Sequence, residues 1–225
     1  KCNILKEECK KQNKNYKKKQ FKILNGKPLW AHTFKPFISS SSIDEIIFVV
    51  EESLISTIKE SDSFKQFVKK KEIKIAKGGA RRMDSVLNGI QVSKKTNNIV
   101  CIHDVARPFL EKSFINKTIE ACRDFDGAIL AIQSVDTVKS AKNEIIKNTL
   151  DRAKIWMAQT PQTFHKDKLL KAYSENIYVN ATDESNLMEL SGFSIKVING
   201  DERNYKITKK TDWGLAEIIA RENKK

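Results

Sequence analysis

Two short segments of this chain combine residue types that suit chemistry on phosphate groups. The hexapeptide HDVARP at 103–108 directly follows the apolar run Ile99–Ile102. Ligands of open α/β sheets bind at the carboxyl ends of strands, so Asp104 stands where a carboxylate can hold Mg²⁺ beside substrate phosphates. Arg107 adds a planar fork that matches phosphate oxygens. By themselves, an Asp and an Arg at this spacing also fit a surface loop closed by a salt bridge.

The second segment is GGARRMDSV at 78–86. Gly78 and Gly79 follow a short predicted strand, and Asp84 or Ser85 can begin a helix. Backbone amides at such a junction suit a nucleotide, because glycine lets the backbone come close and a helix N-terminus favours an anion. The alternative is a capped strand-to-helix turn that binds nothing.

Arginine is rare in this chain. Of 42 Lys+Arg residues only seven are Arg, and Arg152 is the only one between 124 and 202. This isolation favours a role for Arg152 in bidentate phosphate contact. The lysines that produce the net charge of +14 are dispersed along the whole chain. Dispersed lysines indicate solvated surfaces rather than a nucleic-acid interface, and a phosphate-rich substrate also favours a positive cleft.

The elements that position these residues follow an alternating pattern. β-branched apolar runs predict strands at 45–50, 73–76, 98–103, 127–132 and 194–198. Helical patterns lie near 28–38, 53–69, 84–95, 112–123, 166–175, 183–191 and 211–222. The alternation predicts one α/β domain over 1–225, with a mostly parallel sheet covered by helices on both faces. Residues 133–163 break the rhythm, and we interpret them as a protruding β-arm.

Composition excludes several classes of protein. A chain of 225 residues with 40% hydrophobic and 31% charged residues is typical of a globular protein, and no apolar run is long enough to span a membrane. The four cysteines show no disulfide or zinc spacing, and Cys101 lies in a core-like run. We expect free thiols and a cytoplasmic protein, with an organelle as the alternative because residues 1–22 weakly match a transit peptide.

Further motifs connect these segments. Gly78, Gly79, Arg82, Ser85, Val86, Asn88 and Gly89 fit the pattern G-G-x-x-R-x-x-S-V-x-N-G. TPQTF begins at Thr160, TDES at Thr182, and NYKIT at 204–208 contains Lys206. Lys19 stands in KKKQF, shortly before a Gly-Lys-Pro segment. In this order and spacing, from Lys19 to Ala220, the motifs resemble the 2-C-methyl-D-erythritol 4-phosphate cytidylyltransferases of the non-mevalonate isoprenoid pathway.

The resemblance implies a Rossmann-like nucleotidyltransferase fold and a homodimer formed through the arm. It implies that CTP and 2-C-methyl-D-erythritol 4-phosphate give the CDP-alcohol and pyrophosphate, with Mg²⁺ on Asp104. Lys19 and Lys206 would be catalytic. Gly78, Gly79, Arg82, Ser85 and Asp104 would bind the nucleotide, and Arg107, Thr137, Arg152, Thr160 and Thr182 the second substrate. Each role has a purely structural alternative. Lys19 and Lys206 could be solvated lysines, Thr137 and Arg152 could be polar residues on the arm surface, and Thr182 could be a helix N-cap.

One family feature is missing. The family has a Gly-rich loop near its N-terminus, whereas this chain has KEECKKQNKN at 6–15, with Gln12 where a catalytic Arg is expected. Non-glycine residues resist close approach to a triphosphate, and losing the Arg commonly costs about 10³-fold in rate. The alternatives that stay open are a ribitol 5-phosphate cytidylyltransferase and a relative with little or no catalytic activity.

Overall fold

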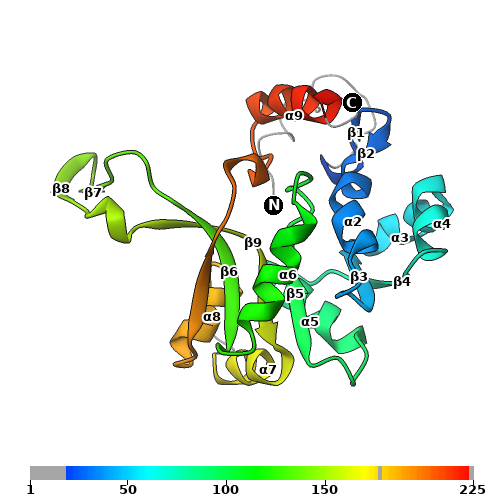
Figure 1. The fold of residues 1–225 in the computed structure, drawn as a ribbon, viewed down its shortest axis with the longest axis horizontal. Helices are drawn as coiled ribbons and strands as arrows, with labels where there is room; N and C mark the ends of the chain where they lie inside the picture. Colours follow the sequence, from blue (N-terminus) through cyan, green and yellow to red (C-terminus); the bar gives the residue numbers. More distant parts are fainter. Residues whose placement is uncertain (1–18, 177–178, 223–225) are drawn as a thin grey trace.

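The computed structural model describes residues 19–176 and 179–222, which form an α/β fold (Figure 1). Its strands are β1 (Ile23–Leu24), β2 (Lys27–Pro28), β3 (Glu45–Val50), β4 (Glu72–Lys77), β5 (Ile99–Ile102), β6 (Gly127–Gln133), β7 (Lys139–Lys142), β8 (Ile145–Thr149), β9 (Trp156–His165) and β10 (Ile195–Asn199). Its helices are α2 (Leu29–Ser39), α3 (Ile55–Glu60), α4 (Asp62–Val68), α5 (Arg82–Val92), α6 (Lys112–Ala121), α7 (Lys166–Glu175), α8 (Glu184–Leu190) and α9 (Lys210–Glu222). Short 3₁₀ turns are η1 (Lys19–Phe21), η2 (Glu52–Leu54), η3 (Arg152–Lys154) and η4 (Glu202–Asn204).

The described strands form a mixed sheet. Four of them follow the order β10-β6-β9-β5, while β3 and β4 pair separately and in parallel. β6 and β10 are also parallel, but β9 runs antiparallel to both of its neighbours. The α/β class is therefore confirmed, whereas the sheet is less parallel than its sequence pattern predicts.

β9 also corrects the predicted boundaries of the arm. Residues 133–163 were expected to leave the sheet together, yet Gln159–Phe164 are all buried within it. The strand is hard to recognise because several of its buried side chains are polar. They find partners inside the protein: Thr163 donates to Thr118, and Gln162 donates to Asp183. The hairpin of β7 and β8 is the part that projects from the body (Figure 1).

Helices cover both faces of this sheet, as the sequence predicts. Adjacent residues of β6 enter different apolar clusters, as alternation along a strand requires. Ile129 packs in the cluster that includes Leu169 of α7 and Leu187 of α8. Leu130 packs in the cluster that includes Phe37 of α2 and Ile115 of α6. Because both faces of the sheet are packed against helices, each strand is held in position, and so are the loops at its ends.

One predicted helix is interrupted. The segment 53–69 contains α3 and α4 with a break at Ser61, whose backbone is extended (φ −68°, ψ 139°). The Ser61 hydroxyl accepts a hydrogen bond from the Phe64 amide at 3.4 Å and so starts a new helix. Serine is a favoured N-cap because its side chain satisfies a free amide of the first turn.

The N-terminal end of the described chain is tied to its C-terminal helix. β1 and β2 form a hairpin across Asn25 and Gly26, both at positive φ, as a two-residue hairpin turn requires. Leu24 packs against Trp213 of α9, and the Asn25 side chain donates to the carbonyl of Ala220. These contacts hold η1, and therefore Lys19, against the last part of the chain.

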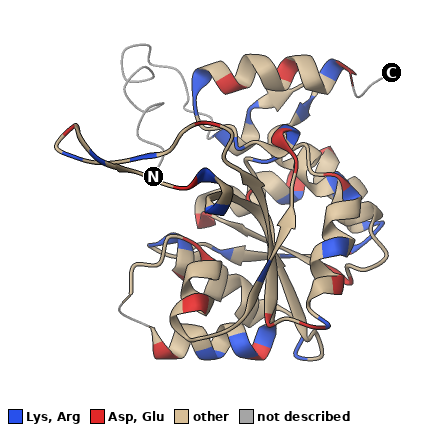
Figure 2. Ribbon diagram, turned by 60° about the vertical axis from the view of Figure 1, so that its left-hand side comes forward, with Lys and Arg blue, Asp and Glu red and all other residues tan. Residues whose placement is uncertain are grey.

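Basic and acidic side chains are interspersed over the ribbon (Figure 2). Within residues 19–176 and 179–222, we find no helix that is long and apolar enough to cross a membrane. Cys101 and Cys122 are free thiols, and burial raises the pKa of Cys101 to about 12. Cys2 and Cys9 lie outside the described residues.

Candidate active site

A tight turn after β5 carries Asp104. The Asp104 amide donates to the Thr160 hydroxyl at 3.0 Å, and that hydroxyl also lies 3.0 Å from His103 Nδ1. His103 Nε2 contacts the Arg107 carbonyl at 3.0 Å, while the Arg107 amide donates to the Asp104 carbonyl. Burial lowers the pKa of His103 well below its usual value, which keeps the ring neutral. The turn is therefore fixed by four hydrogen bonds, none of which uses the Asp104 carboxylate.

Three basic side chains approach this carboxylate. Lys206 Nζ lies 2.8 Å from Asp104 Oδ2, Arg107 Nε lies 3.8 Å from the same oxygen, and Arg82 Nε lies 4.0 Å from Oδ1. Burial by itself would raise the pKa of Asp104, but Lys206 and then Arg82 outweigh it and hold that pKa below its usual value. Asp104 is therefore ionised within a positively charged group of side chains.

Lys19 joins the same region through the backbone. Its ammonium donates to the carbonyl of Ile207, the residue after Lys206. The Ile207 amide in turn donates to the Ala106 carbonyl at 2.9 Å. The structure thus brings together residues from η1, from α5, from the turn after β5 and from the segment after η4, which are distant in sequence.

Arg107 takes a different position from the one its motif predicts. Its side chain is 8% exposed, and its guanidinium donates to the carbonyls of Asn204 at 2.7 Å and Ala158 at 3.4 Å. Burial lowers the pKa of Arg107, while Asp104 opposes that shift. In this arrangement the Arg107 side chain supports the turn through these two buried contacts. Its Nε is buried without a hydrogen bond.

The glycine pair forms a close strand-to-helix turn. The Gly78 amide donates to the Val50 carbonyl, and the Gly79 amide donates to the Ser85 hydroxyl at 2.9 Å. A Cβ on Gly79 would lie 2.4 Å from that of Asp84, so no other residue fits without a backbone shift. α5 begins here at Arg82, two residues before the predicted start.

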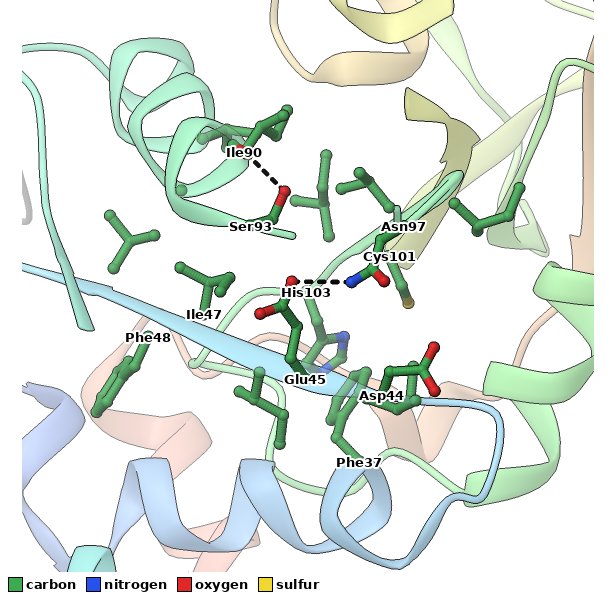
Figure 3. Close-up of a pocket in the computed structure, with 18 of the residues that line it drawn as sticks. Phe37, Asp44, Glu45, Ile47, Phe48, Ile90, Ser93, Asn97, Cys101 and His103 are labelled. Carbon is green, nitrogen blue, oxygen red and sulfur yellow. Dashed lines mark hydrogen bonds between the residues drawn. The ribbon is translucent and has the colours of Figure 1, made fainter. Parts of the chain in front are cut away.

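A cavity of about 540 Å³ lies between β3 and β5 (Figure 3). Arg82, Ser85 and Asp104 line it together with mostly apolar side chains of α2, α5 and the two strands. Away from Asp104, before β5, the Asn97 side chain donates to Glu45 at 2.8 Å. Among the described strands, none pairs with the facing edges of β3 and β5.

The remaining predicted residues lie apart from Asp104. Thr137 and Arg152 are exposed where the arm leaves the sheet, and Arg152 Nη1 donates to the Val135 carbonyl at 2.7 Å. Thr182 is exposed before α8. Thr182 is not the N-cap of this helix: Asp183 is, because its carboxylate accepts from the Asn186 amide. The glycine-free segment, with Gln12, lies outside the described residues.

Sequence reasoning missed several residues that hold the site. Asn204 donates to Gln159 Oε1 at 3.1 Å and to the Thr160 carbonyl at 2.9 Å. Glu184 is 1% exposed and accepts from Arg82 Nη1 at 2.6 and 2.8 Å. Asn204 lies in the NYKIT motif and Glu184 in the TDES motif. Their place inside these motifs was the sequence feature that could have identified them.

Comparisons with known proteins identify the family of this chain. Residues 10–222 match the family model for 2-C-methyl-D-erythritol 4-phosphate cytidylyltransferase (IspD). The enzyme of that name from Clostridium acetobutylicum is 38% identical over 217 residues, covering 95% of this chain and 92% of that protein. A bifunctional IspD/IspF enzyme from Desulfotalea psychrophila is also 38% identical, but this chain spans 53% of its length.

Solved structures show the same fold. The 4-diphosphocytidyl-2C-methyl-D-erythritol synthase of Anaerococcus prevotii superposes with a TM-score of 0.80 at 28% identity, covering 88% of each chain. The cytidylyltransferase of Francisella tularensis gives 0.74 at 31% identity, covering 90% of this chain and 93% of that one. The Rossmann-like nucleotidyltransferase fold is thereby confirmed, and the chain belongs to the 2-C-methyl-D-erythritol 4-phosphate cytidylyltransferase family.

Proposed function

We propose that the side chains around Asp104 transfer the cytidylyl group of CTP to 2-C-methyl-D-erythritol 4-phosphate. The observation that carries this proposal is the meeting of one ionised carboxylate with the side chains of Lys206, Arg82 and Arg107 at the carboxyl end of β5. Such an arrangement can neutralise a triphosphate while keeping its orientation fixed, which is most of what phosphoryl-type transfer requires of a protein.

The reaction needs no covalent enzyme intermediate. A phosphate oxygen of the sugar phosphate attacks the α-phosphorus of CTP and forms the new P–O bond. The bond from that phosphorus to the bridging β-oxygen breaks, and pyrophosphate leaves with the electron pair. The protein contributes alignment and positive charge. Lys19 would face the α-phosphate, and Gly78, Gly79, Arg82 and Ser85 would hold the nucleotide.

Asp104 fits a divalent cation. It is an ionised carboxylate with a 19% exposed side chain at a sheet edge. Among the described residues, no group of three or more His, Cys, Asp or Glu side chains could hold a metal by itself. Mg²⁺ suits this donor set, because it commonly binds through one carboxylate together with substrate phosphates and water. When bound, it would supply charge neutralisation on the triphosphate.

The second substrate would contact residues from two subunits. Lys206 is exposed beside Asp104 and Thr182 is exposed before α8, whereas Thr137 and Arg152 stand at the arm. Thr160 and Arg107 are buried beneath Asp104 and would act mainly by holding it in place. A homodimer in which each arm reaches the neighbouring site would place Arg152 against the sugar phosphate.

The arm carries the features of a dimer contact. Large apolar side chains are strongly exposed on the arm and at the adjoining start of β9: Val135, Ile145, Ile146, Trp156 and Met157 range from 41% to 68%. Several exposed apolar side chains on one segment are typical of an interaction surface. They support the proposed homodimer.

The test is pyrophosphate release from CTP and Mg²⁺ with either 2-C-methyl-D-erythritol 4-phosphate or ribitol 5-phosphate. We expect kcat/KM to be at least about 100-fold higher for the methylerythritol phosphate, because a site built for one substrate's hydroxyls rejects poor fits strongly. Faster turnover of ribitol 5-phosphate would reassign the second substrate. CTP binding without turnover of either would identify a non-catalytic relative.

A further inference from the structure

Glu184 is a buried carboxylate that the proposed chemistry does not use directly. It is the first residue of α8, and 1% of it is exposed. Arg82 Nη1 donates to its two oxygens at 2.8 and 2.6 Å, and the Tyr173 hydroxyl donates to Oε1 at 3.2 Å. Burying a carboxylate is costly unless it is paired and hydrogen-bonded, and both conditions are met here.

The needs of α8 alone do not account for this residue. Asp183 already caps the helix through the Asn186 amide, and the apolar contacts of α8 come from Leu187 and Met188. A negative charge is favoured at a helix N-terminus, but an exposed one would serve as well. What distinguishes Glu184 is its partner, because Arg82 stands at the start of α5, beside Asp104.

The side chain of Arg82 bridges two carboxylates. Its Nη1 is held by Glu184, its Nε lies 4.0 Å from Asp104 Oδ1, and the side chain remains 38% exposed. Among the described residues, its Nη2 makes no hydrogen bond to the protein. Arg82 is thus held at Nη1 by Glu184, while its side chain stays 38% exposed beside Asp104 and so can reach a ligand there.

We propose that Glu184 is a positioning residue that holds Arg82 for the triphosphate of CTP, with Tyr173 fixing the carboxylate. This inference rests on the proposed contact between Arg82 and the nucleotide. A guanidinium that is ordered before the ligand arrives loses less side-chain entropy on binding. Without Glu184, the nearest remaining carboxylate for Arg82 is Asp104, so the guanidinium would turn toward the group assigned to the metal.

The first test is Glu184→Gln, which keeps the shape and the hydrogen bond from Tyr173 but removes the charge. We expect KM for CTP to rise about 10-fold or more, as loss of one partner of a buried ion pair does, while KM for the sugar phosphate changes less than about twofold. Glu184→Asp, which keeps the charge, should recover part of the affinity. The matched control is Glu189→Gln, an exposed Glu on the same helix, with both KM values unchanged.

Combination with Arg82→Ala separates positioning from a merely structural role. If Glu184 acts through Arg82, the double variant should match Arg82→Ala in KM for CTP within about twofold, because the residues form one unit. Independent, multiplying effects would overturn the inference. Equal rises in KM for both substrates, together with a lower melting temperature, would also overturn it. Such a result would mean that the Arg82–Glu184 ion pair serves only to hold α5 against α8.

The same set of variants distinguishes the two proposals. An Arg82→Ala enzyme with unchanged KM for CTP would refute the nucleotide contact of Arg82 itself. A raised KM in Arg82→Ala with normal values in Glu184→Gln would refute only the role of Glu184. If Glu184→Gln does not fold, as judged by circular dichroism, Tyr173→Phe removes the hydrogen bond that fixes the carboxylate, and a CTP-specific rise in KM is again expected. An unchanged KM in that variant would count against the inference.

Discussion

Gly79 is a position where one methyl group decides whether a turn can form. An added Cβ would meet the Asp84 side chain at 2.4 Å and its carbonyl carbon at 3.0 Å. We expect Gly79→Ala to lower the free energy of unfolding by about 1–3 kcal/mol, as overpacking does, and to weaken CTP binding because the turn moves. Urea unfolding and CTP titration measure both effects.

Gly214 provides the matched control. It is exposed within α9, and a Cβ there would meet nothing within 4 Å. Gly214→Ala should therefore stabilise the protein by about 0.5–1 kcal/mol, because alanine loses less backbone freedom in a helix. If Gly79→Ala and Gly214→Ala changed the free energy of unfolding equally, the close packing of the turn at Gly79 would be contradicted.

Asp104 should matter for activity far more than for stability. Its carboxylate belongs to no apolar cluster, and its amide keeps the hydrogen bond to Thr160 whatever the side chain. We expect Asp104→Ala to lower kcat/KM by at least about 100-fold, as loss of a preorganised charge does, with an unchanged circular dichroism spectrum. Asp167→Ala, at an exposed position on α7, is the control. Normal pyrophosphate release by Asp104→Ala would refute the site assignment.

Residue types and spacing indicate which side chains surround Asp104, but not their directions. The HDVARP motif predicts a carboxylate at the end of β5, and the structure has one there. The same motif predicts that Arg107 faces the substrate, whereas Arg107 donates inward to two carbonyls. These acceptors lie on β9 and at the end of η4, so only the tertiary arrangement decides where the guanidinium points.

At the scale of elements, Asp126 ties three of them together. It stands before β6, pairs with Lys168 of α7, and accepts from the amide and hydroxyl of Ser194, which precedes β10, at 2.7 and 2.8 Å. The hydrogen bond from Lys168 lowers the pKa of Asp126 to about 2, and those from Ser194 contribute. A pKa below that of the unfolded chain means that the ionised carboxylate stabilises the folded state.

Removing this charge should produce a pH-dependent loss of stability. We expect Asp126→Asn to lower the free energy of unfolding by about 1–2 kcal/mol at pH 7. The difference from the parent protein should persist down to about pH 4 and shrink between pH 4 and pH 2, as the folded carboxylate becomes protonated. Asp124→Asn, at an exposed position, is the control. A difference that stays constant to pH 2 would contradict the prediction.

Most of the longer helices and strands could be predicted from the local pattern of apolar residues. β9 could not, and the reason is physical. β3 was predicted at 45–50 and occupies those residues, because its apolar run buries Phe48 and Val50 in the cluster formed with α2, α3 and α4. β9 was missed since Thr160, Gln162 and Thr163 look like loop residues until their partners just after β5, just before α8 and on α6 are known. Polar residues in a central strand depend on distant partners, and local pattern contains no information about these.

At the scale of the whole molecule, the proposed dimer means that one chain by itself would not form a complete site. Arg152 stands at η3, at the base of the arm, bonded to the Val135 carbonyl, while Asp104 lies at the end of β5. The exposed apolar side chains of the arm would be covered in a dimer. If the arms are exchanged, every site draws Asp104 from one subunit and Arg152 from the other.

This exchange predicts complementation between two inactive variants. Asp104→Ala and Arg152→Ala should each lack activity, yet a refolded equal mixture should recover about a quarter of the parent activity, because half of the dimers are mixed and each has one intact site. Replacing Lys139–Thr149 with Asn-Gly, which retains the bond between Leu150 and Val138, should give monomers by sedimentation and no recovery. A mixture that stays inactive while dimers form would place Arg152 in the site of its own subunit.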